Sequence, residues 1–184
     1  MNAEPLDVFV TVGMGRWPFD RLLRAIEPVS IRHRVFAQSG TSELRLSYPH
    51  SSFLEREEFE RRCREADVLI THAGNTVRVA QRIGKAPIVV AREQRRGEMG
   101  NDHQVRFLDA ENGLTPMVVL GGDLEDLLVH VEKHREIERA LLRSRTVPTP
   151  ASPIRTASRL DTVDLGDPRR NPLAHMADSR PAWA

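Results

Sequence analysis

The feature that most restricts the fold is the alternation of short apolar runs with amphipathic stretches over the first three quarters of the chain. The apolar runs are rich in Val, Ile and Thr, and they are continuous rather than alternating with polar residues, which predicts strands buried on both faces. We expect these strands at residues 7–12, 34–38, 67–71, 87–91 and 117–120. Such strands, separated by helices, form a parallel sheet flanked by helices with right-handed crossovers. The sequence therefore predicts an α/β, Rossmann-like fold.

Helical periodicity marks the segments between these strands. Apolar residues recur there every three to four positions, which is the spacing of an amphipathic helix. We expect helices at residues 19–26, 55–66, 75–83 and 102–112, and a long helix from Asp123 onward. Gly84 and Gly113 are expected C-terminal stops, and Asp123 has the side chain of an N-cap. Residues 41–54 lack a clear period and predict a loop with some strand.

The composition changes near residue 146. Six of the 12 prolines follow that point, and the apolar periodicity is lost there. Such a composition is typical of disorder. We therefore expect an ordered domain over residues 1–145, which is one domain's worth of chain, and a disordered proline-rich tail over residues 146–184.

Charge and cysteine content argue against several classes of protein. The 27 basic and 26 acidic residues balance, so nothing in the overall charge favours nucleic acid as a partner. The single cysteine, Cys63, cannot form an internal disulfide, which indicates a reducing compartment. No apolar run approaches the roughly 20 residues of a membrane span, and the N-terminus lacks the pattern of a signal peptide. We expect a cytoplasmic protein that reaches a membrane only through a partner or through its C-terminal tail.

Three loops that follow strands are of interest, because ligands in such folds bind beyond the carboxyl ends of the strands. The first contains Gly13 and Gly15, which let the backbone approach a ligand closely. Its alternative interpretation is a plain turn between strand and helix. A dinucleotide fingerprint needs a third glycine where Pro18 stands, so NAD is the less favoured ligand.

The second loop runs from His72 to Thr76. Gly74 suits a backbone shape that other residues avoid, and Asn75 or Thr76 has the side chain to cap the following helix. A helix N-terminus offers free N–H groups and a partial positive charge, which favour a phosphate or pyrophosphate. Considered alone, His72 is more often structural than catalytic.

The third loop is polar and runs from Gly97 into a helix through Asn101, Asp102, His103 and Gln104. Side chains of these types hydrogen-bond the hydroxyls of a sugar. The alternative is helix capping by Asn101 or Asp102, with His103 and Gln104 exposed.

Other chemistry finds little support in the sequence. His130 and His134 are one helical turn apart, but no third metal ligand accompanies them, and a solvated helix face is favoured. The sequence contains neither a GxSxG nucleophile elbow nor a Walker phosphate loop. We therefore expect no metal and no cofactor.

With the loops in this order, the run "VFVTVG…PFDRLLRAI…EFERRCREADVLITHAGNTVRVAQRIGKAPIVVARE…GEMGNDHQVRFL" resembles the C-terminal domain of glycosyltransferase family 28. The resemblance covers about Val8 to Val131. It is closest to the small subunits of split glycosyltransferases, both those of the dolichol pathway and those of bacterial exopolysaccharide synthesis. It implies one half of a GT-B architecture, which binds a UDP-sugar donor.

The resemblance also implies which positions contact the donor. These residues are Thr11, Gly13, Gly15, His72, Ala73, Gly74, Asn75, Thr76, Arg92, Asn101, Asp102, His103 and Gln104. The first two loops would lie at the diphosphate, and the third would face the sugar. One departure stands out: the family's turn is HAG, any residue, then GT, whereas this chain has His-Ala-Gly-Asn-Thr, one residue shorter. We expect a tighter turn with Asn75 in a left-handed conformation.

Glycosyl transfer with inversion requires a base for the acceptor and stabilisation of the leaving diphosphate. This chain offers the second, but its ordered part has no room for an acceptor half. We therefore expect a donor-binding subunit of a hexosyltransferase, completed by a membrane-anchored partner that holds a lipid-linked acceptor and supplies the base. The alternative is a non-catalytic nucleotide-sugar-binding module that regulates a partner.

Overall fold

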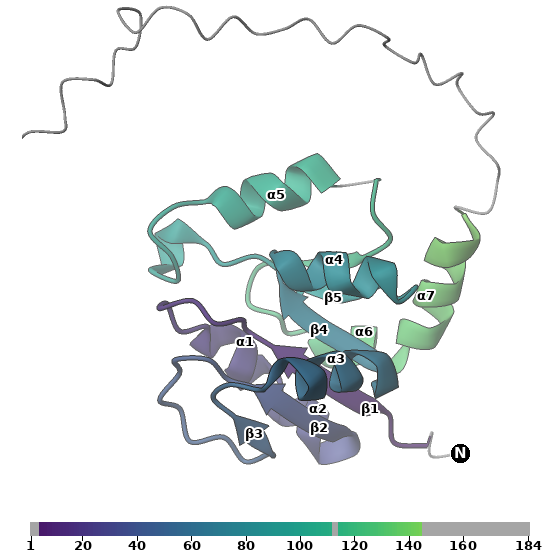
Figure 1. Ribbon diagram of the computed structural model, residues 1–184, viewed down its shortest axis with the longest axis horizontal. Helices are drawn as coiled ribbons and strands as arrows, with labels where there is room; N and C mark the ends of the chain where they lie inside the picture. Colours follow the sequence, from purple (N-terminus) through teal and green to yellow (C-terminus); the bar gives the residue numbers. More distant parts are fainter. Residues whose placement is uncertain (1–3, 112–113, 145–184) are drawn as a thin grey trace, which may run out of the picture. The chain divides into compact units, whose positions relative to one another are not determined.

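A six-stranded, all-parallel sheet forms the centre of the computed structural model, which describes residues 4–111 and 114–144 (Figure 1). The strands lie in the order β3-β2-β1-β4-β5-β6. Their bounds are β1 Asp7–Thr11, β2 Arg34–Gln38, β3 His50–Ser51, β4 Val68–His72, β5 Ile88–Val90 and β6 Val118–Leu120. The predicted Rossmann-like α/β fold is thereby confirmed. The predicted tail, residues 146–184, lies outside the described residues, as does Gly113.

Helices cover both faces of this sheet (Figure 1). One face carries α1 (Asp20–Ala25), α2 (Glu27–Arg32) and α6 (Leu127–Glu132), whose apolar residues join those of the strands in the largest core cluster. The other face carries α3 (Arg56–Glu65) and α4 (Asn75–Arg82), with α5 (His103–Glu111) beside α4. A short 3-10 helix, η1 (Gln94–Arg96), follows β5, and α7 (His134–Arg143) ends the described chain.

Side-chain alternation assigns the two faces of the central strands. Val8 and Val10 of β1 pack with α1 and α6, whereas Phe9 between them packs against α3. The same alternation holds in β4, where Ile70 lies on the first face and Leu69 on the second. Because both faces are covered, the strands are apolar at nearly every position, which is the pattern seen in the sequence.

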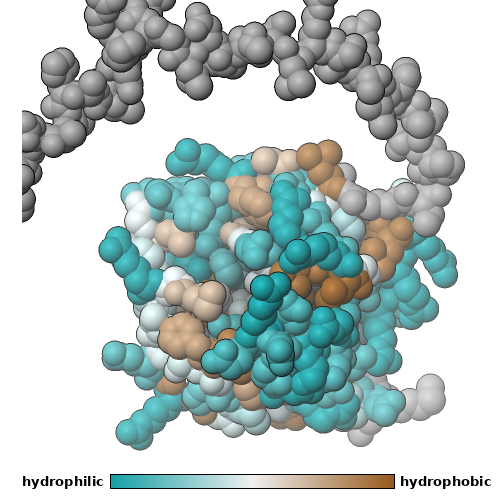
Figure 2. All heavy atoms as spheres, viewed as in Figure 1, coloured by the Kyte–Doolittle hydropathy of each residue, from teal (hydrophilic) through white to brown (hydrophobic). Residues whose placement is uncertain are grey.

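The outer surface of α3 is charged. Arg61 pairs with Glu58 and Glu65 across successive turns of this helix. Figure 2 shows the corresponding face as largely hydrophilic, with a smaller hydrophobic area. The buried residue of α3 is Cys63, which lies on the side of the helix that faces the sheet.

The predicted strands match the observed ones to within about one residue at each end. The predicted helix at residues 19–26 is α1, but a second helix, α2, follows it directly and was not predicted. The long helix expected from Asp123 is wrong: two helices, α6 and α7, meet at Lys133. Asp126, not Asp123, precedes α6, and Asp123 instead pairs with Arg96.

Candidate anion-binding site at the strand switch point

The chain reverses its direction of travel across the sheet between β1 and β4. From β1 the chain crosses to β2 through α1 and α2 on one face, and from β4 it crosses to β5 through α4 on the other face. The carboxyl ends of these two strands are adjacent, because Thr11 pairs with Thr71. In open α/β sheets, ligands bind in the crevice that such a switch creates. Two of the three predicted loops begin here.

The first loop leaves β1 at Thr11, which is fully buried. Its hydroxyl donates to Oε1 of Gln38 and accepts a hydrogen bond from the backbone N–H of Gly13. Gly13 has a φ of +78°, a conformation that side chains disfavour. Gly15 has neither a positive φ nor a heavy atom within 4 Å of an added Cβ, so its position does not require glycine.

The imidazole of His72 lies between the first two loops. A Cβ on Gly13 would be 2.5 Å from Cε1 of His72, and a Cβ on Gly74 would be 2.5 Å from its Nε2. Both glycines therefore make room for this ring. The expectation that Gly74 adopts a shape closed to other residues is wrong, because its φ of −161° is ordinary extended backbone.

The second loop ends at the N-terminus of α4. Gly74 is the N-cap residue, and no side chain caps the helix. Asn75 is the first helical residue and not left-handed, since Leu124 is the single non-glycine residue of positive φ in the described ranges. The first backbone N–H groups of α4 consequently have no side-chain acceptor, as an anion site requires.

Two residues of this loop and one of β4 are buried near the start of α4. Thr76 is 7% exposed and Ala73 is 3% exposed. Thr71 is fully buried and its hydroxyl has no hydrogen-bond partner. Since Thr71 shares its face with Leu69, it lies on the side of the sheet that α4 covers. An unpartnered buried hydroxyl on that side suits a bound acceptor or donor.

The N-terminus of α1 is a poorer anion site than that of α4. Helix α1 has Asp20 in its first turn, whereas the first turn of α4 has no acidic residue. The Asp20 carboxylate accepts a hydrogen bond from the Ser42 hydroxyl at 2.7 Å and is thereby held in place. A negative charge at the start of α1 repels a phosphate, so the second loop is favoured over the first.

Burial lowers the pKa of His72 to about 4. The Arg92 guanidinium and, more weakly, His103 also lower this pKa, and the backbone of Thr11 acts in the opposite direction. Nδ1 of His72 is buried without a hydrogen-bond partner. The ring is therefore neutral at physiological pH.

Arg92 follows β5 and is buried, with 2% of its surface exposed. Its Nη2 donates to the carbonyls of Val12 (2.7 Å) and Trp17 (3.1 Å), and its guanidinium lies over the Phe19 ring. Nε is buried without a partner, and burial lowers the pKa of the side chain to about 10. Arg92 thus fastens the first loop to β5 and places a positive charge near His72.

The third loop is fastened to the chain that follows β5. The Gln104 side chain is buried and accepts a hydrogen bond from the backbone N–H of Arg92 at 3.0 Å. Asp102 accepts one from the backbone N–H of Gln94 at 2.7 Å. Asn101 caps the start of α5 by accepting from the backbone N–H of His103, and both residues are exposed. The alternative interpretation expected capping by Asn101 or Asp102 and exposure of His103 and Gln104. Asn101 and His103 agree with it, whereas Gln104 is buried and does not.

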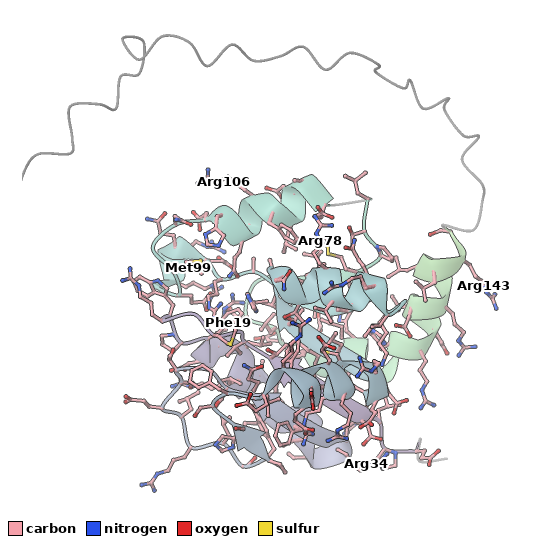
Figure 3. All side chains as sticks on the ribbon, in the orientation of Figure 1. Phe19, Arg34, Arg78, Met99, Arg106 and Arg143 are labelled. Atoms are coloured by element: carbon pink, nitrogen blue, oxygen red, sulfur yellow. The ribbon has the colours of Figure 1, made fainter. Side chains whose placement is uncertain are left out.

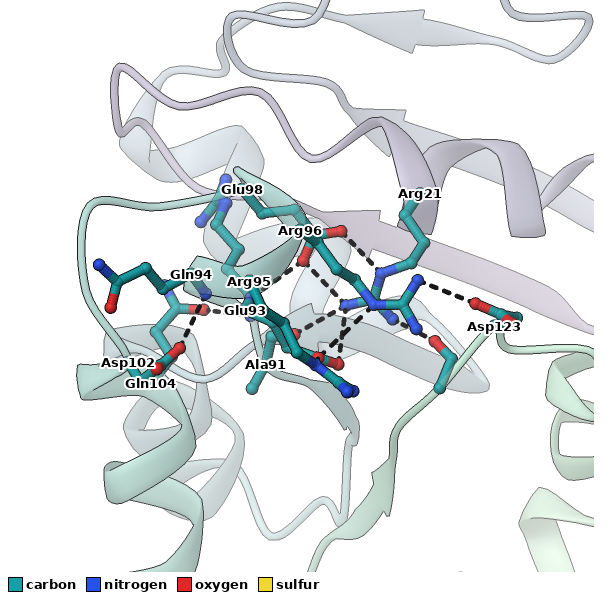
Figure 4. Close-up of polar contacts among 12 residues, drawn as sticks. Arg21, Ala91, Glu93, Gln94, Arg95, Arg96, Glu98, Asp102, Gln104 and Asp123 are labelled. Atoms are coloured by element: carbon teal, nitrogen blue, oxygen red, sulfur yellow. Dashed lines mark hydrogen bonds and ion pairs between the residues drawn. The ribbon is translucent and has the colours of Figure 1, made fainter.

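A guanidinium–carboxylate network holds this loop against α1 (Figure 4). Arg21 donates to both oxygens of Glu98, at 2.7 and 2.9 Å, and also to the carbonyls of Ala91 and Gly122. Glu98 in turn accepts from the backbone N–H of Glu93. One arginine therefore joins α1, the end of β5, the η1 loop and the turn after β6. We call this network of Arg21 with Glu98, Ala91 and Gly122 the Arg21 clamp.

Neither the clamp nor the contact of Trp17 with the third loop was predicted from the sequence. Arg21 and Glu98 are 77 residues apart, so no local pattern pairs them. Trp17 approaches the third loop, because a Cβ on Gly100 would be 3.6 Å from its ring. Figure 3 shows Phe19 and Met99 at the same end of the sheet, and Arg106 pointing outward from α5.

A surface hollow of about 460 Å³ lies between α5 and the ends of β5 and β6. Its apolar lining includes Val105, Leu108 and Leu120, and Asp102 of the third loop lies on its wall. Its volume lies within the range of small-molecule sites. The hollow gives a ligand room beside the third loop.

The structure thus brings Thr11, Gly13, His72 and Gly74 together at the switch point, with Arg92 close by. Two cations that follow the second loop in the sequence, Arg78 and Lys85, form contacts elsewhere. Arg78 extends from α4 toward α5 (Figure 3) and pairs with Glu111. Lys85 donates to the carbonyls of Arg64 and Ala66.

Comparisons with known proteins do not assign the chain to a family. No family model matches the chain, and no curated protein matches its sequence. Over residues 4–111 and 114–144, His, Cys, Asp and Glu side chains do not gather in any group of three that would hold a metal ion. Over the same ranges, every helix is too short or too polar to cross a membrane.

Proposed function

We propose that this domain binds the diphosphate of a nucleotide sugar at the switch point between β1 and β4. The observation that carries the proposal is the uncapped N-terminus of α4 beside His72 and Gly13. Free N–H groups and the positive end of a helix dipole lie there, and no acidic residue lies in the first turn of α4. The buried Arg92 adds a positive charge that acts on His72. These features favour a phosphate group over a neutral ligand.

The position of the anion site favours a nucleotide sugar over a dinucleotide. A dinucleotide would place its pyrophosphate at the helix after β1, where Asp20 stands in the first turn. The helix after β4 lacks this charge. The hollow beside Asp102 and the polar loop from Asn101 to Gln104 leave space and hydrogen-bonding groups for a sugar.

We further propose that the chain is the donor-binding subunit of an inverting glycosyltransferase, with the form of one half of a GT-B enzyme. The helix dipole of α4 would stabilise the negative charge that develops on the leaving UDP. A partner at the membrane would hold the acceptor and supply the base that takes its proton. The resemblance to glycosyltransferase family 28 supports this extension.

Calorimetry of the full chain with UDP, UDP-glucose, UDP-N-acetylglucosamine and UDP-glucuronic acid tests the binding step. We expect UDP and at least one nucleotide sugar to bind, and Gly74→Ala and Gln104→Ala to weaken that binding. Arg32→Ala, which removes an exposed ion pair of α2, is the matched control. If none of the four ligands binds, the proposal is wrong.

A second experiment separates the enzyme from the regulatory module. The chain is mixed with membranes that contain the product of a neighbouring gene for a membrane-anchored partner, and transfer of labelled sugar to lipid is measured. Transfer that requires both components supports the donor subunit. Binding without transfer favours a non-catalytic module that senses nucleotide sugars.

A further inference from the structure

His72 lies beside the start of α4, so its protonation is coupled to the binding of a charged ligand there. Its ring is in contact with Gly74, the N-cap residue of that helix, on the Nε2 side and with Gly13 of the first loop on the Cε1 side. An anion held by the first N–H groups of α4 would therefore lie directly beside the imidazole. A neutral imidazole has one ring nitrogen that can take a second proton, and Nδ1 of His72 is buried without a hydrogen-bond partner.

Apart from the backbone of Thr11, which favours the charged form, the surroundings of this ring oppose a charge on it. Arg92, which follows β5, is a buried cation, His103 of α5 acts in the same direction, and the dipole of α4 presents its positive end. Among the described residues, no carboxylate contributes to the shift of its pKa. A bound phosphate group would be the first negative charge against the imidazole.

We infer that the binding of a phosphate-bearing ligand at the first turn of α4 draws a proton onto His72, so that the site binds more tightly as the pH falls. The inference rests on the function proposed above and adds a regulation that this function does not require. The bound anion and the imidazolium stabilise each other, and by linkage each raises the affinity for the other.

The size of the effect follows from the charges. An opposite charge at close range shifts a pKa by about 1–3 units. The pKa of His72 is about 4. If binding raises it by about two units, the ligand binds about tenfold more tightly at pH 5 than at pH 8, and about half a proton is taken up at pH 6.

Calorimetry in buffers of different ionisation enthalpy measures this proton uptake directly. The probes are UDP-glucose, UDP-N-acetylglucosamine and UDP-glucuronic acid, because their diphosphates do not titrate between pH 5 and 8. We expect uptake at pH 6 and a rise in affinity toward pH 5. Binding that is independent of pH, with no proton uptake, overturns the inference and leaves the proposed function standing. Failure of all three probes to bind at any pH overturns both.

Two variants assign the proton. His72→Gln should abolish the uptake, whereas His130→Gln, which removes a histidine of α6 outside the site, should retain it. The reverse result overturns the inference. Should His72→Gln fail to fold, nuclear magnetic resonance of the wild-type imidazole signals decides instead, with His103→Gln used for assignment. A His72 ring that stays neutral at pH 6 in the complex also overturns the inference.

Discussion

Nε2 of His72 lies where a side chain on Gly74 would have to be: an added Cβ would approach it to 2.5 Å. The backbone at Gly74 is extended and suits any residue, so this contact alone excludes a side chain. Position 74 therefore requires glycine because of the neighbouring His72 ring, and this requirement can be tested by changing either residue.

We expect Gly74→Ala to lower the free energy of unfolding by about 1–3 kcal/mol, the usual cost of overpacking. In a His72→Ala background the clash is absent, so most of this cost should vanish, leaving the small penalty of alanine at an N-cap. Urea denaturation of the four proteins in the double-mutant cycle measures the coupling.

Two other glycines serve as references for this cycle. Gly15→Ala should be nearly neutral, because nothing lies within 4 Å of the added carbon and φ is not positive. Gly13→Ala should remain costly by about 1–2 kcal/mol even without His72, since alanine is strained at a φ of +78°. Equal costs of Gly74→Ala in both backgrounds would contradict the assigned contact.

The Arg21 clamp should contribute far more to stability than the ion pairs on the surface. The side chains of Arg21 and Glu98 are only 12% and 9% exposed. Arg21→Ala would leave the Glu98 carboxylate nearly buried and unpaired, at a cost of about 3–5 kcal/mol. Arg32→Ala, which breaks an exposed pair with Glu132, should cost at most about 1 kcal/mol. Thermal and urea denaturation compare the two, and similar losses would show that the clamp is not stabilising.

Stability should decline as the pH falls below about 6.5, the ordinary pKa of an unfolded histidine. The pKa of His72 is about 4 in the folded protein, so the unfolded chain binds the proton first. This histidine alone should remove about 2 kcal/mol between pH 8 and pH 5, and its contribution levels off below pH 4. Denaturation in phosphate-free buffer should give a shallower decline for His72→Gln. An unchanged slope in this variant would mean that His72 is already charged.

Cys63 should be inert in the folded protein. It is fully buried against the sheet, and burial raises the pKa of its thiol to about 11. Because the thiolate is the reactive form, an aromatic disulfide reagent at pH 8 should label it only as the protein unfolds. The labelling rate should therefore follow the urea transition, and rapid labelling without urea would contradict this burial.

The sheet could be predicted from the sequence because burial on both faces leaves a local trace in each strand. The helices were less predictable at their joints. The break at Lys133 is stabilised by His134, a buried residue whose Nε2 bonds the Ala86 carbonyl. No sequence pattern near residue 133 predicts the contact of His134 with Ala86, which lies 48 residues earlier.

The candidate site was predictable in its location but not in its contacts. Strand order cannot be derived from strand positions, so the adjacency of β1 and β4 required the structure. Gly74 was expected to serve the backbone and instead accommodates His72. Gln104 was expected at a sugar, and its carbonyl oxygen is occupied by the backbone of Arg92. In both cases the decisive partner is a tertiary contact, which leaves no periodic signal.

The switch point also joins an earlier and a later part of the chain. Strands β1 to β3 end at Ser51, before any of β4 to β6 begins, so the first three strands emerge from the ribosome before the others. Gly13 belongs to the early half, and His72 with the start of α4 belongs to the late half. The candidate anion site of an emerging chain is therefore incomplete until β4 has docked beside β1. If the proposed ligand binds there, its binding to translation intermediates would report the docking of the two halves.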